Sequence, residues 1–206
     1  MVAHRLPLGL SVVRPGSRCP ACRTPVRAVD NVPVVSWLLL RGRCRGCHGR
    51  ISPRYAVVEA LSGLLAAGAF HVLVADAGRA AEPVAWLHWL VVFAVTSAML
   101  AASLVDLDHR ILPDAITKPG MWAGPALCAF VPEVVLGPGR APPGWLPAAL
   151  PAPVAAAIVS GAGVAVGAGV IWGLGVVGTR VFKKEAMGFG DVKFLGLIGG
   201  FVGPAG

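Results

Sequence analysis

The sequence predicts an all-α polytopic membrane protein that carries a small tetracysteine zinc-binding domain at its N-terminus. Of the 206 residues, 56% are hydrophobic and only 14% are charged, a composition outside the range of soluble globular domains. Long apolar runs begin after residue 54, and the clearest have about the 20 residues that a membrane-spanning helix needs. Four of the five cysteines precede these runs. We therefore divide the chain into a cysteine domain at 1–54 and a membrane domain at 55–206.

Two Cys-x2-Cys pairs in the first domain predict a structural metal site. Cys19 pairs with Cys22 and Cys44 with Cys47, with 21 residues between the pairs. Such pairs form tight turns, and four thiolates can surround one Zn²⁺ tetrahedrally. Four protein ligands leave no open position, so we expect the zinc to stabilise the domain rather than to catalyse a reaction. The alternative is four free or disulfide-bonded cysteines, and we expect His48 to be a surface residue.

Two features near the junction of the domains have more than one interpretation. The segment Asp30–Trp37 is a polar turn that leads into a short apolar stretch. It could pack against the zinc core or the membrane surface, or it could form a face that handles substrate. Glu59 lies about one turn into the first apolar run, where an acid is costly. We expect it to pair with Arg54 or to line a polar cleft.

Five apolar runs predict about four to five transmembrane helices. They are Tyr55–Ala75, Val84–Val105, Ala115–Val131, Val154–Val181 and Val192–Gly206. The third is short, and we expect its Cys128 to be a small packing residue. The fourth has glycines at four-residue spacings, which let helices approach closely. Because the fifth has only 15 residues and the chain starts in a segment that resembles a loop, we expect the chain to lack terminal membrane helices.

The basic residues alternate between loops in a way that predicts which loops share one side of the membrane. The net charge is +8, and ten of the eighteen Lys and Arg residues lie in 1–54, opposed there by a single acid. Residues 106–118 and 179–193 hold most of the others, whereas 76–83 and 132–153 hold one arginine each. The positive-inside rule then assigns the basic segments to the cytoplasm. The chain lacks the stacking aromatics of a nucleic-acid module, so we expect no nucleic-acid binding.

Two aspartates at the ends of apolar runs form the candidate catalytic pair. Asp106 follows the second run, and Asp191 follows Gly188-Phe-Gly190 after the fourth. Ionisable residues at such positions are costly and usually functional, and two adjacent carboxylates can share a proton and activate water. The glycines would let a substrate strand come close to Asp191. Asp108 lies about 200° from Asp106 on a helix, so only one of the two can face a catalytic centre.

Helix caps and salt bridges are the structural alternatives for these acids. We expect Asp114 to cap the helix that follows it. Arg110 or Lys193 could pair with either candidate aspartate, and the acids would then have a structural role alone.

Five motifs in register resemble the bacterial type IV prepilin peptidases, which are polytopic aspartic proteases of the inner membrane. They are the paired Cys-x2-Cys turns, Asp30–Trp37, Ile51–Glu59, Asp106–Asp114 and Gly188–Lys193. The resemblance covers nearly the whole chain. It implies that the catalytic residues are Asp106, which opens the motif ending in Pro-Asp, and Asp191, the acid of Gly-x-Gly-Asp. Gly188, Gly190, Asp108 and Lys193 would support this catalytic motif.

The resemblance also implies an activity, cofactors and partners. Family members cut the basic leader from membrane-anchored prepilins and pseudopilins on the cytoplasmic side, typically after a glycine. Many also methylate the new N-terminus with S-adenosylmethionine, an activity linked to the form with the cysteine domain. Family members usually have a further N-terminal membrane helix and a complete helix after Gly-x-Gly-Asp, and this chain shows neither in full. We expect a multi-pass protein of the bacterial inner membrane with its active site and zinc domain in the cytoplasm; the sequence fixes no oligomeric state.

Three classes of function follow from these observations. In the protease, Asp106 and Asp191 share one proton, the ionised member activates water, and the protonated member stabilises the oxyanion. The second class is an inactive fragment or a non-enzymatic zinc-bearing scaffold for pilus or secretion assembly. A transporter fits less well, because the acids lie at helix ends rather than at mid-membrane. The chain has no Gly-x-Ser-x-Gly or His-Glu-x-x-His string, which argues against the common serine and zinc proteases.

Overall fold

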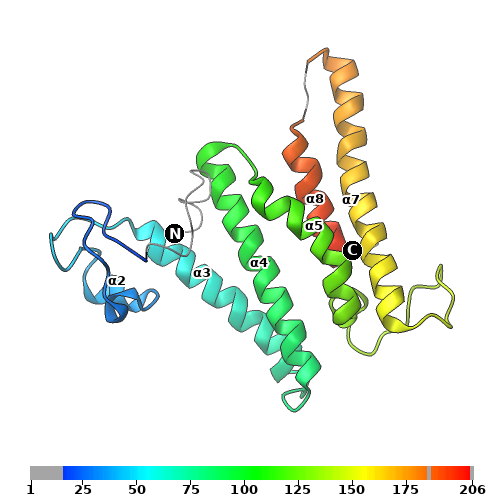
Figure 1. Ribbon diagram of the computed structural model, residues 1–206, viewed down its shortest axis with the longest axis horizontal. Coiled ribbons are helices and arrows are strands. Elements are labelled where there is room, and N and C mark those ends of the chain that lie inside the picture. The colour runs from blue at the N-terminus through cyan, green and yellow to red at the C-terminus, as the bar shows by residue number, and fades with distance from the viewer. Residues whose placement is uncertain (1–15, 185–186, 205–206) are drawn as a thin grey trace. The chain divides into compact units, whose positions relative to one another are not determined.

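A computed structural model describes residues 16–184 and 187–204, and every regular element in these ranges is a helix (Figure 1). The elements are η2 (Ala28–Asn31), α2 (Val35–Leu39), α3 (Pro53–Phe70), the single π-helical turn η3 (His71–Ala75), α4 (Pro83–His109), α5 (Asp114–Phe130), α6 (Glu133–Leu136), α7 (Ala152–Phe182) and α8 (Phe189–Val202). The all-α prediction is confirmed for the described residues. The first fifteen residues of the predicted cysteine domain lie outside them.

The chain contains two compact units. The N-terminal unit is Met1–Val72 and the helical unit is Leu73–Gly206. The first comprises the cysteine turns, α2 and α3, and the second comprises α4 to α8.

Among the described residues, three helices are long and apolar enough to cross a membrane. They are Pro53–Ala75, Pro83–His109 and Ala152–Phe182, which agree with three of the predicted runs. α5 has 17 residues and contains Pro119 and Pro125, each of which removes a backbone hydrogen bond within the helix. α8 has 14 residues. The predicted total of four to five spans therefore stays a prediction.

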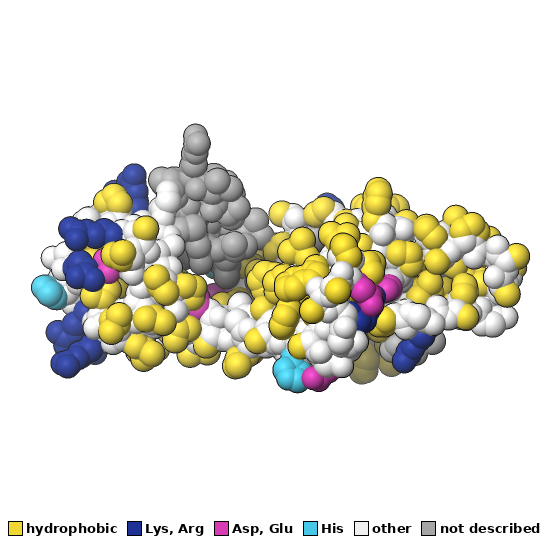
Figure 2. All heavy atoms as spheres, turned by 90° about the horizontal axis from the view of Figure 1, so that it is seen from below, with side chains coloured by type: hydrophobic (Ala, Val, Ile, Leu, Met, Phe, Trp, Pro, Cys, Tyr) yellow, Lys and Arg dark blue, Asp and Glu magenta, His cyan; other side chains and the backbone are white. Residues whose placement is uncertain are grey.

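The exposed surface of these helices agrees with a membrane protein. No more than 28% of the most apolar window of any of the three candidate spans is buried. Figure 2 shows hydrophobic side chains over much of the visible surface of the helices. A soluble protein rarely exposes apolar areas of this extent, so lipid is the environment that suits them.

Close contact between α7 and α8 organises the helical unit, as the glycine spacing predicted. The backbones of Gly163 and Gly199 touch so closely that a Cβ atom on either would clash with the carbonyl of the other. Next to them, the buried hydroxyl of Ser160 donates a 2.5 Å hydrogen bond to the carbonyl of Gly200. Cys128 of α5 is fully buried against the same carbonyl, which confirms its packing role.

Three helix ends meet at one end of the helical unit. α4 ends there, and α5 and α8 begin there, whereas α7 ends well beyond them (Figure 1). Leu112, in the connection between α4 and α5, contacts Gly190 at the start of α8. The fold therefore brings the connection between α4 and α5 next to the start of α8. We call this region the aspartate end.

Candidate functional site

The four cysteines of the N-terminal unit form one cluster. Their sulfur atoms all lie within 4.8 Å of one another, with 3.8 Å between Cys19 and Cys47 and 4.0 Å between Cys22 and Cys44. A tetrahedral site with metal–sulfur bonds of about 2.3 Å has sulfur–sulfur distances of roughly 3.8 Å. All four thiols are free of disulfides. The donor set and its spacing therefore fit a single tetrahedrally coordinated metal ion.

The two cysteine turns share one backbone design. In the first, the Cys19 amide donates to Thr24 and the Arg23 amide donates to the Cys19 carbonyl. In the second, the Cys44 amide donates to Gly49 and the His48 amide donates to the Cys44 carbonyl. Arg23 and His48 hold the same place in the turn, and both adopt a positive φ, 58° and 55°. His48 is exposed, as predicted, and its part in the turn is conformational.

The thiols of the cluster differ in acidity. Hydrogen bonds with the hydroxyl and then the backbone of Thr24 lower the pKa of Cys22 to about 6. For Cys47, a backbone hydrogen bond from Gly49 lowers the pKa, but the neighbouring thiols and desolvation outweigh it and raise the pKa to about 11. Metal binding requires thiolates, so Cys22 is the sulfur that meets this requirement most readily at neutral pH.

Hydrogen bonds attach α2 to the start of α3 within the N-terminal unit. The indole nitrogen of Trp37 donates to the carbonyl of Ile51 at 3.1 Å, and the amide of Val34 donates to the Glu59 carboxylate at 2.9 Å. Glu59, which the sequence left without a definite role, therefore accepts a hydrogen bond from the segment that joins the cysteine turns. Asp30 in the same segment forms a bidentate pair with Arg45, at 2.7 to 3.1 Å.

Asp106 and Asp191 both lie at the aspartate end, on different helices. Asp106 is in the last turn of α4, where its carbonyl accepts from the amide of Arg110 at 2.7 Å. Asp191 is the third residue of α8, which follows the N-cap Gly188. Both side chains are exposed. Among the residues that the structure describes, neither carboxylate forms an ion pair, and no hydrogen bond joins the two.

The two glycines before Asp191, Gly188 and Gly190, contact different neighbours. A Cβ atom on Gly190 would lie 3.3 Å from the side chain of Leu112, so Gly190 lets α8 begin close to the α4–α5 connection. Gly188 faces the Asp191 carboxylate, 3.7 Å from where its Cβ would be. The lack of a side chain at Gly188 therefore leaves space beside Asp191, whereas the lack of one at Gly190 allows close packing against Leu112.

Lys193 and Asp114 connect α8 to α5. The Lys193 ammonium donates to one carboxylate oxygen of Asp114, and Lys118 pairs with the other at 2.6 Å. Hydrogen bonds from Lys118 and then Lys193 hold the pKa of Asp114 below its usual value. The Lys193 ammonium also lies 5.2 Å from the ring centre of Phe189.

The prediction that Asp114 caps the next helix is wrong. α5 begins at Asp114 itself, Pro113 is the N-cap, and no side chain caps the helix. The carboxylate instead neutralises two lysines, one of them 79 residues away in sequence. The salt-bridge alternative for Lys193 therefore has its partner in Asp114 rather than in a candidate catalytic aspartate.

A second charged group, which the sequence did not reveal, lies at the opposite end of α4. Arg79 pairs with Glu82 and with Glu133 of α6, each at 2.7 Å, and the Nδ1 atom of His88 lies 3.6 Å from Glu133. We call these four residues the arginine network. Its residues come from one loop and from two helices, and Glu133 is far in sequence from the other three, so no local pattern identifies the network.

Comparison with known proteins agrees with this arrangement. Residues 1–73 match the Bacterial Peptidase A24 N-terminal domain, and residues 93–206 match the Type IV leader peptidase family. No solved structure matches the chain at a significant level.

Curated relatives match along nearly the whole chain. A Myxococcus xanthus protein named prepilin leader peptidase/N-methyltransferase is 36% identical over 98% of this chain and 51% of its own length. A type 4 prepilin-like proteins leader peptide-processing enzyme of Escherichia coli is 33% identical over 95% of this chain and 61% of its own length. The chain thus spans about half to three-fifths of these relatives. Because the second family match covers more than half of the chain, the protein belongs to the type IV leader peptidase family.

Proposed function

We propose that this protein is a membrane aspartic endopeptidase that removes the leader from prepilins and pseudopilins. One observation carries the proposal: two exposed carboxylates, Asp106 and Asp191, come from separate helices to the same end of the helical unit, and neither is neutralised by a described cation. The family match and the names of the relatives supply the substrate class.

The chemistry needs one base and one acid. Asp191 lies in the first turn of α8, where the helix dipole favours a negative charge, so we assign it the role of base. It takes a proton from water, which attacks the scissile carbonyl. Asp106 lies in the last turn of α4, where the dipole disfavours negative charge, so we assign it the role of acid that protonates the oxyanion. When the intermediate collapses, Asp191 passes the proton from water to the leaving amine, and Asp106 regains a proton from a hydroxyl of the intermediate. Gly188 leaves room for the substrate backbone, Gly190 lets α8 begin close to Leu112, and Lys193 orients the start of α8.

The substrate follows from the location of the acids at helix ends. Its apolar helix would lie in the bilayer, and its basic leader would meet the acids at the membrane surface. The basic segments around both aspartates favour the cytoplasmic side of the bacterial inner membrane. We keep 1–54 and 55–206 as the functional division, with the zinc-binding domain first and the peptidase domain second.

Methylation is a second candidate activity. It is favoured because several relatives carry N-methyltransferase in their names. S-adenosylmethionine would be the methyl donor. Cleavage and methylation are separable, because they add different mass changes to one product.

Zn²⁺ is the metal that we propose for the cysteine cluster, since four clustered thiolates suit zinc and leave no open coordination position. We expect one zinc per chain by elemental analysis. A Cys22→Ser, Cys44→Ser double variant should lose it, because it removes one ligand from each turn. Equal zinc content in both proteins would contradict the assignment.

The test of the proposed activity is mass spectrometry of a prepilin substrate incubated with the protein in lipid and S-adenosylmethionine. The native chain should release the leader, and the Asp191→Asn variant should not. A further methyl mass on the product would identify the second activity. A zinc-loaded native chain that binds the substrate without cleaving it would favour the scaffold instead.

A further inference from the structure

The segment between the cysteine turns exposes an apolar face that the proposed activity does not use. Its members are Val29, Val32, Val35, Leu38 and Leu39, which are 69%, 47%, 52%, 61% and 78% exposed. Val35, Leu38 and Leu39 have the spacing of one helix face, so α2 presents them together. A small domain in water rarely exposes so many large apolar side chains within eleven residues. Something apolar therefore covers this face.

The attachment of α2 to α3 determines where the apolar face lies along the candidate membrane span. The Val34 amide is bonded to Glu59, the seventh residue of α3. At a rise of about 1.5 Å per residue, Glu59 is roughly 9 Å along the helix from its first residue. Pro53–Ala75 is a candidate membrane span. A segment bonded to the second turn of a membrane span lies at the membrane boundary, where lipid is the apolar material present.

A strained turn fixes the direction of α2. Val34 has φ 59° and ψ −51°, and the amide of Val35 donates to the carbonyl of Pro33 at 2.5 Å. These values define a γ-turn with positive φ, which is rare and is most costly for a β-branched residue. Glu59 accepts the hydrogen bond from the amide of Val34 and so holds this turn against α3. Such strain persists only where surrounding contacts impose it.

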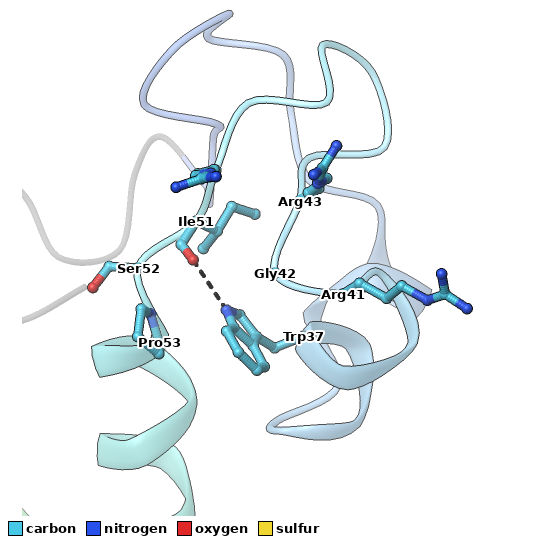
Figure 3. A pocket seen from close by; sticks show the side chains of 8 residues that line it. Trp37, Arg41, Gly42, Arg43, Ile51, Ser52 and Pro53 are labelled. Carbon is cyan, nitrogen blue, oxygen red and sulfur yellow. Dashed lines mark hydrogen bonds between the residues drawn. The ribbon is translucent and has the colours of Figure 1, made fainter.

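Basic side chains lie close to α2, on the side of the helix that carries Trp37. Arg41, Arg43 and Arg50 line a surface cavity of about 420 Å³ together with Trp37 and the residues that open α3. Figure 3 shows this cavity between Trp37 and the start of the helix, with the Arg41 side chain directed outward. Within the described part of the chain, none of these three arginines forms an ion pair. Guanidinium groups bind phosphate strongly, and basic groups beside a membrane span attract anionic lipids.

We propose that this face is a membrane-docking surface for anionic phospholipid. Val35, Leu38 and Leu39 enter the boundary between headgroups and acyl chains, and Arg41, Arg43 and Arg50 bind lipid phosphates. The cysteine cluster stabilises the domain that carries this surface. Of the two interpretations of Asp30–Trp37 that the sequence left open, this geometry favours the membrane surface over a face that handles substrate.

Photocrosslinking identifies the occupant directly. Benzoylphenylalanine would replace Leu39 in the full chain, and the exposed Ala21 of the first cysteine turn would be the matched control position. The protein is reconstituted in nanodiscs of phosphatidylcholine with or without phosphatidylglycerol. We expect phospholipid adducts at position 39, several-fold more than at position 21, and more with phosphatidylglycerol. Adducts formed only with a prepilin peptide or a second protein chain, equal yields at both positions, or no adduct would each overturn the proposal.

Hydrogen exchange on the native chain gives a second test that needs no unnatural residue. Amides of residues 29–40 should exchange several-fold more slowly in phosphatidylglycerol nanodiscs than in phosphatidylcholine nanodiscs. An Arg41→Gln, Arg43→Gln variant should lose that difference while its zinc content stays unchanged, and an Arg18→Gln control should keep it. Exchange that is independent of lipid charge would overturn the role of the arginines. Neither test depends on cleavage, so its outcome is independent of the proposed peptidase activity.

Discussion

The charged side chains at the two ends of α4 differ in burial and in ion pairing. At its start, the arginine network is largely buried: the side chains of Arg79, His88 and Glu133 are 12%, 6% and 20% exposed, and the two ionic residues pair with each other. At its end, Asp106 is exposed and makes no described ion pair. Buried ions must be paired to be tolerated, whereas exposed carboxylates stay available to solvent and ligands. Glu133 thus forms a buried ion pair at one end of α4, whereas Asp106 at the other end stays exposed to solvent.

The arginine network also has polar atoms without partners. Arg79 Nη1, His88 Nδ1 and Glu133 Oε2 are buried and make no hydrogen bond among the described residues. A network in this state depends strongly on each charge that remains. The contrast between the two ends therefore predicts which substitutions affect stability and which affect activity.

Neutralising Glu133 tests the arginine network at the start of α4. It should have the largest effect on the free energy of unfolding. Glu133→Gln leaves the Arg79 charge without its buried partner, which should lower the free energy of unfolding by about 3 kcal/mol. Glu82→Gln is the matched control, because Glu82 pairs with the same arginine but is 51% exposed. It should cost less than about 1 kcal/mol. Denaturant unfolding in detergent measures both, and equal losses would remove the distinction between buried and exposed pairs.

Breaking the ion pair between Lys193 of α8 and Asp114 of α5 tests whether this link orients Asp191 at the aspartate end. Lys193→Gln removes the cation that joins α8 to Asp114, so Asp191 loses orientation and cleavage should fall roughly 10- to 100-fold. Lys118→Gln is its control, since Lys118 pairs with Asp114 inside α5 and leaves the link to α8 intact. Single-turnover leader cleavage compares the two variants. If both lose the same activity, the α8–α5 link is not what positions Asp191.

The smallest expected effect is a pH dependence of the stability that the Asp114 ion pairs contribute. Because two lysines lower the pKa of Asp114, its pairing contributes to stability above the unfolded carboxyl pKa of about 3.9. The contribution is lost as the pH falls through the lower, folded pKa. Thermal midpoints of the native chain and Asp114→Asn should therefore differ at neutral pH and converge below about pH 4. A difference that grows on acidification would contradict the sign of the shift.

Local patterns in the sequence predicted more than long-range ones did. The cysteine cluster follows from two short turns whose residues are close in sequence. The glycine spacing within α7 likewise predicted that another helix could approach closely, although it did not identify α8 as that helix. Three of the predicted spans also correspond to long helices, since apolar length is a property of one segment.

The sequence did not predict which residues from distant segments interact. Asp114 looked like a helix cap, yet it binds Lys193 from another helix. Glu59 was given Arg54 or a cleft as its partner, yet it accepts a hydrogen bond from the backbone of Val34. Arg79 and Glu133 are 54 residues apart. Tertiary packing alone decides such partners, because many charged residues are equally available along the chain.

Substitutions of Asp106 and Asp108 test most directly whether Asp106 is a catalytic aspartate. The two aspartates lie two residues apart at the end of α4, and both are exposed. Leader cleavage would be measured for Asp106→Asn and Asp108→Asn at matched zinc content and thermal midpoint. Asp106→Asn should abolish cleavage, whereas Asp108→Asn should retain most of it. Substantial cleavage by Asp106→Asn, or an equal loss in both variants, would contradict the assignment of Asp106 as a catalytic aspartate.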